Sequence, residues 1–247
     1  MTTSNFQKPG LNQLYWVADN IIASGFPPVT KALRDPDGLL AIGGNLSSET
    51  LLDAYRRGIF PWYSKGQPIL WWSPNPRCVL EVEDLKISRS LHKTIRRNIF
   101  TVTFNREFDQ VIKSCAEPRE EFADTWITDD MDIAYNRLHN DGYAISVETW
   151  YGNELVGGLY GLVIGKVFFG ESMFSRMTDA SKVALVILAE ELKRREFRII
   201  DCQVHSRHLQ SLGARPMPRD LFVNLLQHYC NQADNLPWPQ TQTQASA

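Results

Sequence analysis

Three strands joined by two-residue turns restrict the fold of this chain more than any other feature. Residues 144–150 alternate apolar and polar side chains, and a Gly-Asn pair at 152–153 would turn them into a second strand over 155–164. A Gly-Lys pair at 165–166 turns the chain again into a third strand over 167–174. Turns this short join antiparallel neighbours, so we predict an antiparallel meander.

The segments after the meander suggest a fold class. A loop over 175–179 leads into a predicted helix over 180–195, then a strand over 199–204 and a last helix over 219–232. The long helix has a buried stripe made of Ala180, Val183, Ala184, Ile187 and Leu188. Meander, loop, long helix, strand and helix is the order of an N-acyltransferase core, in which the acyl donor lies near the loop that starts the helix. This analogy at the level of fold does not establish a function.

The first 76 residues differ from this pattern. A strand is predicted over 39–42, and Ser47 is a suitable N-cap for a helix with Leu51, Leu52 and Tyr55 on its apolar face. Two aromatic-proline tracts follow, at 60–63 and 71–77, where three prolines argue against regular structure. We therefore predict an α/β (α+β) protein with a small N-terminal α/β domain (1–76), a GNAT-like domain with a mixed, largely antiparallel sheet (77–236), and a disordered tail (237–247). Further predicted elements are a basic helix capped by Ser88, a strand over 101–104, and helices over 107–115 and 128–140.

Composition excludes several classes of protein. The chain has 247 residues, 43% of them hydrophobic, and a formal net charge of −2, which is typical of a globular protein rather than one that coats nucleic acid. It contains no apolar stretch of the ~20 residues needed to span a bilayer and no signal peptide. Its four scattered cysteines indicate a reduced, cytoplasmic chain, which we expect to be a monomer. Cys202, His205 and His208 match none of the common zinc-ligand spacings, so no metal is expected.

Two strand ends carry polar residues that could perform chemistry. Glu171 ends the third meander strand, where alternation would place it on the same face as Met173. A carboxylate there needs a partner, either a substrate or merely a helix end or an arginine. Asp201 and Gln203 share a face of the next predicted strand, where they could hold and orient an amine or simply bond to nearby backbone.

The sequence contains one group of aromatic residues and one group of basic residues, and each group has two interpretations. The aromatic residues near the predicted boundary could stack on unpaired bases, although aromatic side chains more often fill a core; they are Trp62, Tyr63, Trp71 and Trp72, with Trp126 further along. One side of the helix after Ser88 carries Arg89, Lys93, Arg96 and Arg97. This side is either a solvated helix face or a phosphate-binding patch suited to tRNA.

The absence of several binding motifs restricts which acyl donor the chain could use. The chain lacks a P-loop, a dinucleotide-binding fingerprint, and any glycine in loop 175–179. Acetyl-CoA-dependent N-acetyltransferases place glycines in that loop so that backbone amides can approach the pyrophosphate. We therefore expect no cofactor and an acyl donor other than CoA.

Four segments closely resemble the leucyl/phenylalanyl-tRNA–protein transferase family: 58–62 (GIFPW), 69–74 (ILWWSP), 170–176 (GESMFSR) and 200–203 (IDCQ). The likeness runs from about residue 32 to about residue 229. It implies a small N-terminal domain, an acyltransferase-like domain, and transfer of Leu, Phe or sometimes Met from aminoacyl-tRNA to an N-terminal Arg or Lys. The acceptor protein would thereby be marked for degradation.

The resemblance also implies roles for matching residues. Asp201 and Gln203 would be the catalytic pair, and Glu171 would help to hold the amine. Other implied groups are a wall of the aminoacyl-adenosine site (Trp62, Trp126 and Tyr135), a pocket for the donor side chain (Leu159 and Met173), and an acceptor-stem patch containing Arg96 and Arg97. Leu159 stands where the family is expected to have Met, a substitution that conserves volume. Segment 205–208 resembles the family less, and no role is carried over there.

A mechanism follows as a hypothesis. The donor is already an ester, so no ATP is needed, and the nucleophile is an α-amine with a pKa of about 7.7–8.0 that must lose a proton. Asp201 would polarise the Gln203 side chain, whose amide oxygen orients the amine, and Asp201 would take the proton directly or through water. The leaving ribose oxygen would be protonated by its neighbouring hydroxyl. The competing hypotheses are a CoA-dependent N-acyltransferase, a non-enzymatic tRNA-binding module, and a purely structural protein.

Overall fold

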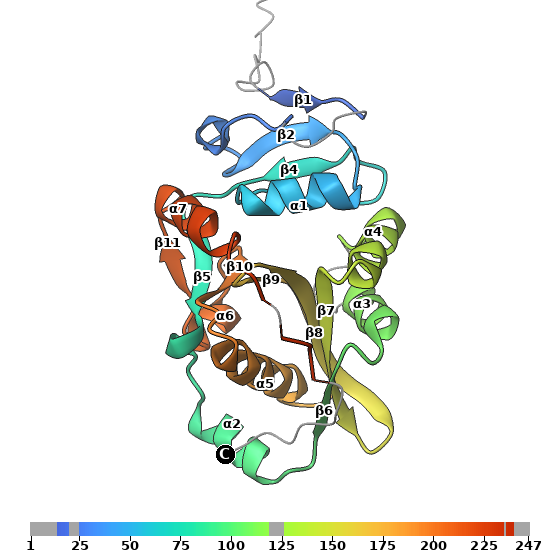
Figure 1. Ribbon diagram of the computed structural model, residues 1–247. Helices are drawn as coiled ribbons and strands as arrows, with labels where there is room; N and C mark the ends of the chain where they lie inside the picture. The colour runs from blue at the N-terminus through green and yellow to red at the C-terminus, as the bar shows by residue number, and fades with distance from the viewer. Residues whose placement is uncertain (1–13, 20–24, 119–125, 235, 240–247) are drawn as a thin grey trace, which may run out of the picture.

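Two β-sheets organise the chain in the computed structural model, which describes residues 14–19, 25–118, 126–234 and 236–239. The smaller sheet contains β1 (Tyr15–Val17), β2 (Leu39–Gly43), β3 (Phe60–Pro61) and β4 (Leu70–Trp72). The larger sheet contains β5 (Arg77–Glu81), β6 (Thr101–Phe104), β7 (Ala144–Tyr151), β8 (Glu154–Ile164), β9 (Val167–Ser175), β10 (Ile199–Gln203) and β11 (Arg215–Met217). The strand orders are β1-β2-β4-β3 and β11-β5-β10-β9-β8-β7-β6 (Figure 1).

Helices cover both faces of the larger sheet. They are α1 (Ser48–Arg56), α2 (Arg89–Arg96), α3 (Phe108–Ala116), α4 (Asp129–Asn140), α5 (Ala180–Arg194), α6 (Arg207–Ser211) and α7 (Arg219–Tyr229). Ser47, Ser88 and Thr128 cap α1, α2 and α4 by accepting a hydrogen bond from the backbone N–H three residues on, which confirms the predicted starts of the first two helices. None of the helices in the described part of the chain has the length and apolar character needed to cross a bilayer.

The predicted meander is confirmed. Strands β7, β8 and β9 pair antiparallel in sequence order. Strand β10 returns after α5 and pairs parallel with β9, whereas its other neighbour, β5, runs antiparallel. The larger sheet is therefore mixed and largely antiparallel, as expected.

Two hydrophobic clusters lie on opposite faces of this sheet. One cluster joins the smaller sheet to α1, α3, α4 and α7, and it includes Tyr55, Trp71, Tyr135 and Phe222. The other lies beneath α5 and α2 and includes Leu91, Leu159 and Leu188. Figure 1 shows α1 between the two sheets, and α2 at the end of the molecule farthest from the smaller sheet. The first cluster therefore packs the smaller sheet onto the larger one through α1.

Several elements differ from the expectation for proline-rich and terminal segments. The aromatic-proline tracts contain β3 and β4, and β5 begins at Arg77. Pro61 is tolerated because β3 is the edge strand of its sheet, where one missing N–H breaks no ladder. Helix α6 was not expected; Ser206 caps it, and its five residues are too few to show an apolar period.

The segment expected to be a disordered tail also differs in part. The guanidinium of Arg195 donates to the carbonyl oxygens of Leu236 and Pro237 and lies 4.0 Å from the centroid of the Trp238 ring. Trp238 in turn stacks on Phe104 of β6. Residues 240–247 lie outside the described residues.

Candidate active site

Polar side chains gather where β9 and β10 separate. These parallel strands pair from Val167 with Ile199 to Phe169 with Asp201, and β9 then continues to Ser175 without β10 as its partner. Glu171, Asp201 and Gln203 lie at this opening. Where two central strands separate, side chains from both can turn toward one another instead of being held apart by a continuous ladder.

A β-bulge in each strand directs these side chains. In β9, Gly170 pairs with Gly161 and Ser172 pairs with Tyr160, so Glu171 is an extra residue in the strand. The expected alternation is therefore wrong: Glu171 contacts the cluster around Tyr55, whereas Met173 packs against the cluster on the opposite face. The shared face predicted for these two residues fails because a bulge reverses the alternation that follows it.

The second bulge lies in β10. Asp201 pairs with Val79 and Gln203 with Cys78, so Cys202 is the extra residue. Gln203 has a φ of 59°, an uncommon conformation for a residue other than glycine. This turn directs the Gln203 amide toward Glu171, and its Nε2 donates to Glu171 Oε1 at 2.9 Å.

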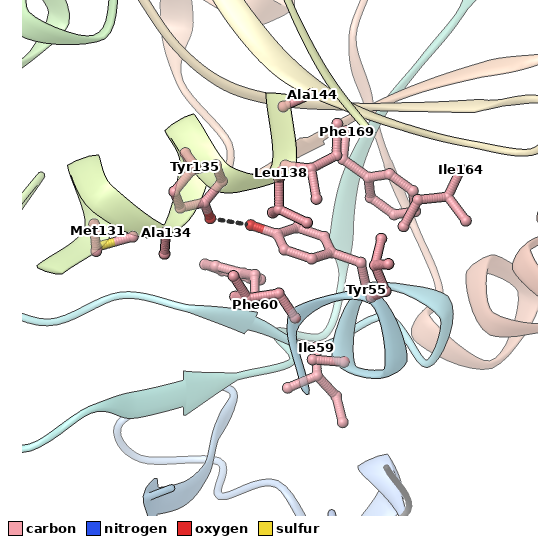
Figure 2. Close-up of a cluster of buried hydrophobic side chains, with 14 of the residues drawn as sticks. Tyr55, Ile59, Phe60, Met131, Ala134, Tyr135, Leu138, Ala144, Ile164 and Phe169 are labelled. Carbon is pink, nitrogen blue, oxygen red and sulfur yellow. Dashed lines mark hydrogen bonds between the residues drawn. The ribbon is translucent and has the colours of Figure 1, made fainter. Parts of the chain in front are cut away.

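Glu171 is bound by two phenols as well as by this amide. Tyr55 Oη lies 2.7 Å from Glu171 Oε1, Tyr135 Oη lies 2.9 Å from Oε2, and the two phenol oxygens are 2.5 Å apart. Figure 2 shows Tyr55 and Tyr135 meeting from α1 and α4 within the apolar cluster. Burial raises the pKa of Glu171 to about 7, although the hydrogen bonds from Tyr55 and Tyr135 lower it. The carboxyl therefore titrates near neutral pH.

Asp201 is engaged by a buried arginine. Arg77 Nε and Nη2 donate to Asp201 Oδ1 and Oδ2 at 2.8 and 2.7 Å, and both side chains are at most 1% exposed. Arg77 Nη1 also donates to the carbonyl oxygen of Gly58. The guanidinium lies 4.6 Å from the Phe60 ring centroid and 5.0 Å from that of Phe222. This bidentate pair links β5 and β10 to the segment after α1.

The structure changes the expected relation between Asp201 and Gln203. Asp201 Oδ1 accepts a hydrogen bond from the backbone N–H of Gln203 at 2.9 Å, whereas the Gln203 side chain bonds to Glu171. Asp201 thus holds the Gln203 backbone and does not polarise its side-chain amide directly. Arg77 and Tyr55 had no site role in the sequence analysis, because nothing local to either residue indicates these distant partners.

The residues expected around the donor are distributed over both faces of the sheet. Trp62 is 43% exposed and packs against Trp72. Trp126 is partly buried against the first hydrophobic cluster. The preceding residues, 119–125, lie outside the described residues. Tyr135 is fully buried, with its hydroxyl facing Tyr55 and Glu171. Leu159 lies directly opposite Met173 on β8.

A hollow of about 400 Å³ extends from Met173. It reaches the loop that starts α5 and the side chain of His208 on α6. Its lining residues are Ser114, Glu117, Pro118, Met173, Phe174, Ser175, Arg176, Ser181 and His208. Burial, and after it the charge of Lys182, lowers the pKa of His208.

The basic residues of α2 form a separate surface. Arg89, Lys93, Arg96 and Arg97, together with His92, line a hollow of about 510 Å³. Within the residues that the structure describes, these four basic side chains form no ion pair with an acidic one. Thr94 on the same helix donates to Asp179 at 2.9 Å, which ties α2 to the start of α5.

The glycine opposite the Glu171 bulge leads to a first prediction. A Cβ on Gly161 would lie 2.2 Å from the carbonyl oxygen of Phe169, whereas one on its pair Gly170 would meet nothing closer than 3.4 Å. We expect Gly161→Ala to lower the free energy of unfolding by about 1–3 kcal/mol because β8 and β9 must move apart. Gly170→Ala, the matched control, should change it little. Urea unfolding of both variants measures this, and equal stability of the two would contradict the assigned bulge.

No metal site is evident in the described ranges: no group of three or more His, Cys, Asp or Glu side chains is placed to hold an ion. The thiols of Cys78 and Cys202 meet across β5 and β10, and a hydrogen bond between them lowers the pKa of Cys78. Neither thiol contacts Glu171.

Comparisons with known proteins cover most of the chain. A family model described as leucyl/phenylalanyl-tRNA protein transferase matches residues 79–227, and the model of its N-terminal domain matches residues 44–75. A relative from Nitrosomonas eutropha is 53% identical over 224 residues, which cover 88% of this chain and 96% of the relative. Another from Aromatoleum aromaticum is 59% identical over 207 residues, covering 84% and 87%. Both relatives are named leucyl/phenylalanyl-tRNA–protein transferase.

A solved structure described as L-PGS from Bacillus licheniformis is 11% identical, with a TM-score of 0.38 over 68% of this chain and 54% of that one.

Proposed function

The chain belongs to the leucyl/phenylalanyl-tRNA–protein transferase family, and from this premise we propose how it moves Leu or Phe from aminoacyl-tRNA to the N-terminal Arg or Lys of an acceptor protein. Met is proposed as a third donor, and the product as a mark for degradation. The observation that carries the proposal is the opening between β9 and β10, where Glu171, Asp201 and Gln203 meet within the matched residues. We propose that the enzyme works as a cytoplasmic monomer without a cofactor.

Gln203 and Glu171 are proposed to contact the reacting groups. Because Gln203 Nε2 donates to Glu171, the amide oxygen is available to accept a hydrogen bond from the attacking amine. Asp201 fixes the Gln203 backbone in its left-handed conformation. The donor ester is already activated, so positioning the two substrates supplies much of the rate; well-oriented reactions gain about 7–11 kcal/mol in this way.

The donor is proposed to lie across the opening. Leu159 and Met173, which are cross-strand neighbours, would line the pocket for its side chain. Trp62 and Trp126 would flank the terminal adenosine, and the partly exposed Trp62 ring suits stacking on a base. Tyr135 is too enclosed to stack there, so we assign it to Glu171. The division into domains at 1–76 and 77–236 is kept as part of this proposal.

The direct test is transfer of radiolabelled Leu from charged tRNA to a peptide that begins with Arg, beside the same peptide beginning with Gly. We expect label on the Arg peptide alone. If the folded protein binds the tRNA and labels neither peptide, it is a binding module. Calorimetry with acyl-CoA tests the CoA-dependent alternative, for which we expect no binding.

A second prediction concerns tRNA affinity. The basic side chains of α2 carry no acidic partner among the described residues and can neutralise phosphates of the acceptor stem. Arg96→Ala combined with Arg97→Ala should weaken binding and reduce the slope of log affinity against log salt by about 2. Filter binding between low and moderate salt measures the slope. Lys113→Ala with Lys193→Ala removes the same charge elsewhere on the surface, and an equal effect of that control would show that only net charge matters.

A further inference from the structure

Three oxygen contacts close a ring around Glu171. Tyr55 contacts Oε1, Tyr135 contacts Oε2, and the two phenols contact each other at 2.5 Å. Tyr55 comes from α1, Tyr135 from α4 and Glu171 from β9, so segments separated by up to 116 residues meet here. Both phenols are completely buried. A fourth hydrogen bond reaches the ring from Gln203.

Counting hydrogens shows which protonation state of Glu171 closes this ring. A phenol carries one hydrogen, and burial raises the pKa of both Tyr55 and Tyr135, so each keeps its hydrogen. Two phenols supply two hydrogens for three contacts. The third hydrogen must come from the carboxyl of Glu171. When Glu171 is ionised, both phenols can donate to it, which lowers its pKa, and the contact between the two phenol oxygens is left without a hydrogen. The ring of hydrogen bonds therefore closes only around the neutral acid.

The neighbouring carboxylate, Asp201, is less suited than Glu171 to accept the proton. Asp201 is 0% exposed, and its Oδ1 accepts from both Arg77 Nε and the Gln203 N–H, while Oδ2 accepts from Arg77 Nη2. A proton on Asp201 would weaken the charge-assisted hydrogen bonds from Arg77, because these need the ionised carboxylate. Glu171, by contrast, gains a hydrogen bond when it is protonated.

We propose that Glu171 takes the proton from the attacking amine, and that Tyr55 and Tyr135 are positioning residues whose hydroxyls hold that proton within a closed ring. The inference deepens the proposed function and rests on it. In the step assigned to Glu171, an N–H bond of the acceptor's ammonium breaks and an O–H bond forms on the carboxylate. The freed lone pair then attacks the ester: a C–N bond forms, the ester C–O bond breaks, the nitrogen loses a second proton and the ribose oxygen gains one.

Titratable and charged groups from the surrounding elements face Glu171. Tyr55 on α1, Tyr135 on α4 and Tyr160 on β8 face Glu171, together with Asp201 on β10 and Arg77 on β5. Burial raises the pKa of Glu171 to about 7, close to the value of about 7.7–8.0 for an α-amine, so the proton can pass between them at neutral pH.

Deleting one hydroxyl tests the ring. Tyr55→Phe removes a bond that lowers the pKa of Glu171, so the rising limb of transfer rate against pH should move upward by about one unit. The matched control is Tyr160→Phe, because Tyr160 is equally buried in the same cluster and its hydroxyl has no hydrogen-bond partner among the described residues. The rising limb of transfer rate against pH should lie at the same pH in Tyr160→Phe as in the wild type. Tyr135→Phe supplies the same test from α4 should Tyr55→Phe fold poorly.

The readouts separate this inference from the proposed function. If the wild-type protein transfers no amino acid, the proposed function fails. If it transfers normally but Tyr55→Phe leaves the limb in place, or Tyr160→Phe moves it equally, the ring is overturned. Infrared spectra of the free enzyme near pH 6 add a test that needs no activity: a protonated carboxyl band should be present in the wild type and absent in Glu171→Gln.

Discussion

Replacing Asp201 by Ala is expected to lower the free energy of unfolding by about 3–5 kcal/mol. The change leaves the Arg77 guanidinium 1% exposed between Phe60 and Phe222, with the Gly58 carbonyl as its remaining hydrogen-bond acceptor among the described residues. An uncompensated buried charge is among the most costly defects a core can carry, and domains commonly have only about 5–15 kcal/mol of stability. Urea unfolding monitored by circular dichroism measures the loss.

A double variant distinguishes a structural from a chemical role of this pair. Arg77→Met with Asp201→Leu removes both charges and keeps the volume apolar, so we expect it to recover much of the stability lost by Asp201→Ala. It should still transfer slowly, because the Gln203 N–H loses the oxygen that holds it. Unfolding of Asp201→Ala at the wild-type midpoint would refute the stabilising role.

Replacing Glu171 by Gln should lower the transfer rate by about 10²–10⁴-fold, the range typical of lost general-base catalysis. Gln has nearly the same shape; its amide oxygen can accept from Tyr55 and its NH2 group can donate to the Tyr135 hydroxyl, so the fold and the affinity for aminoacyl-tRNA should persist. Single-turnover transfer to an Arg peptide, at saturating enzyme, measures the chemical step. Glu154→Gln, at the exposed start of β8, is the matched control and should react at the wild-type rate. An unaltered rate for Glu171→Gln would exclude Glu171 as the base.

The same variant should change how stability depends on pH. The folded-state pKa of Glu171, about 7, lies above its ordinary 4.5, so the folded protein binds more protons than the unfolded chain between these values. The stability from this carboxyl is fully present below about pH 4.5 and is lost as pH rises through about 7. Relative to Glu171→Gln, the wild type should lose up to about 3 kcal/mol over this range. If the wild type and Glu171→Gln lose the same free energy of unfolding between pH 5 and pH 8, Glu171 is not a buried acid with a raised pKa.

Local patterns accounted for much of the architecture. Short turns at 152–153 and 165–166 fix neighbouring strands of the meander, and a serine before an apolar period marks the start of α1 and of α2, because each signal acts within a few residues. The helix predicted over 180–195 and the observed α5 agree for the same reason. The contiguous motifs also sufficed to identify the family, which the matched models bear out.

The site itself was decided by tertiary structure. Whether Glu171 follows strand alternation depends on the register of β8, and the left-handed turn at Gln203 depends on the partner of β10. No residue near Glu171 or Gln203 in the chain records the position of a partner strand, so alternation predicted the wrong face for Met173. Only pairing across the sheet could reveal the bulges.

The sequence by itself determined the meander, the long helix and the strand and helix that follow it, the family, and the three polar residues at the strand ends. What only the tertiary structure decided is which of their atoms meet. Tyr55 has the same place in a helical period as any core residue, and Arg77 lies 124 residues from Asp201, yet both contact the site. A hydroxyl on an apolar helix face and a distant buried cation leave no local signal, because their energies arise from partners that the folded chain alone brings within hydrogen-bonding distance.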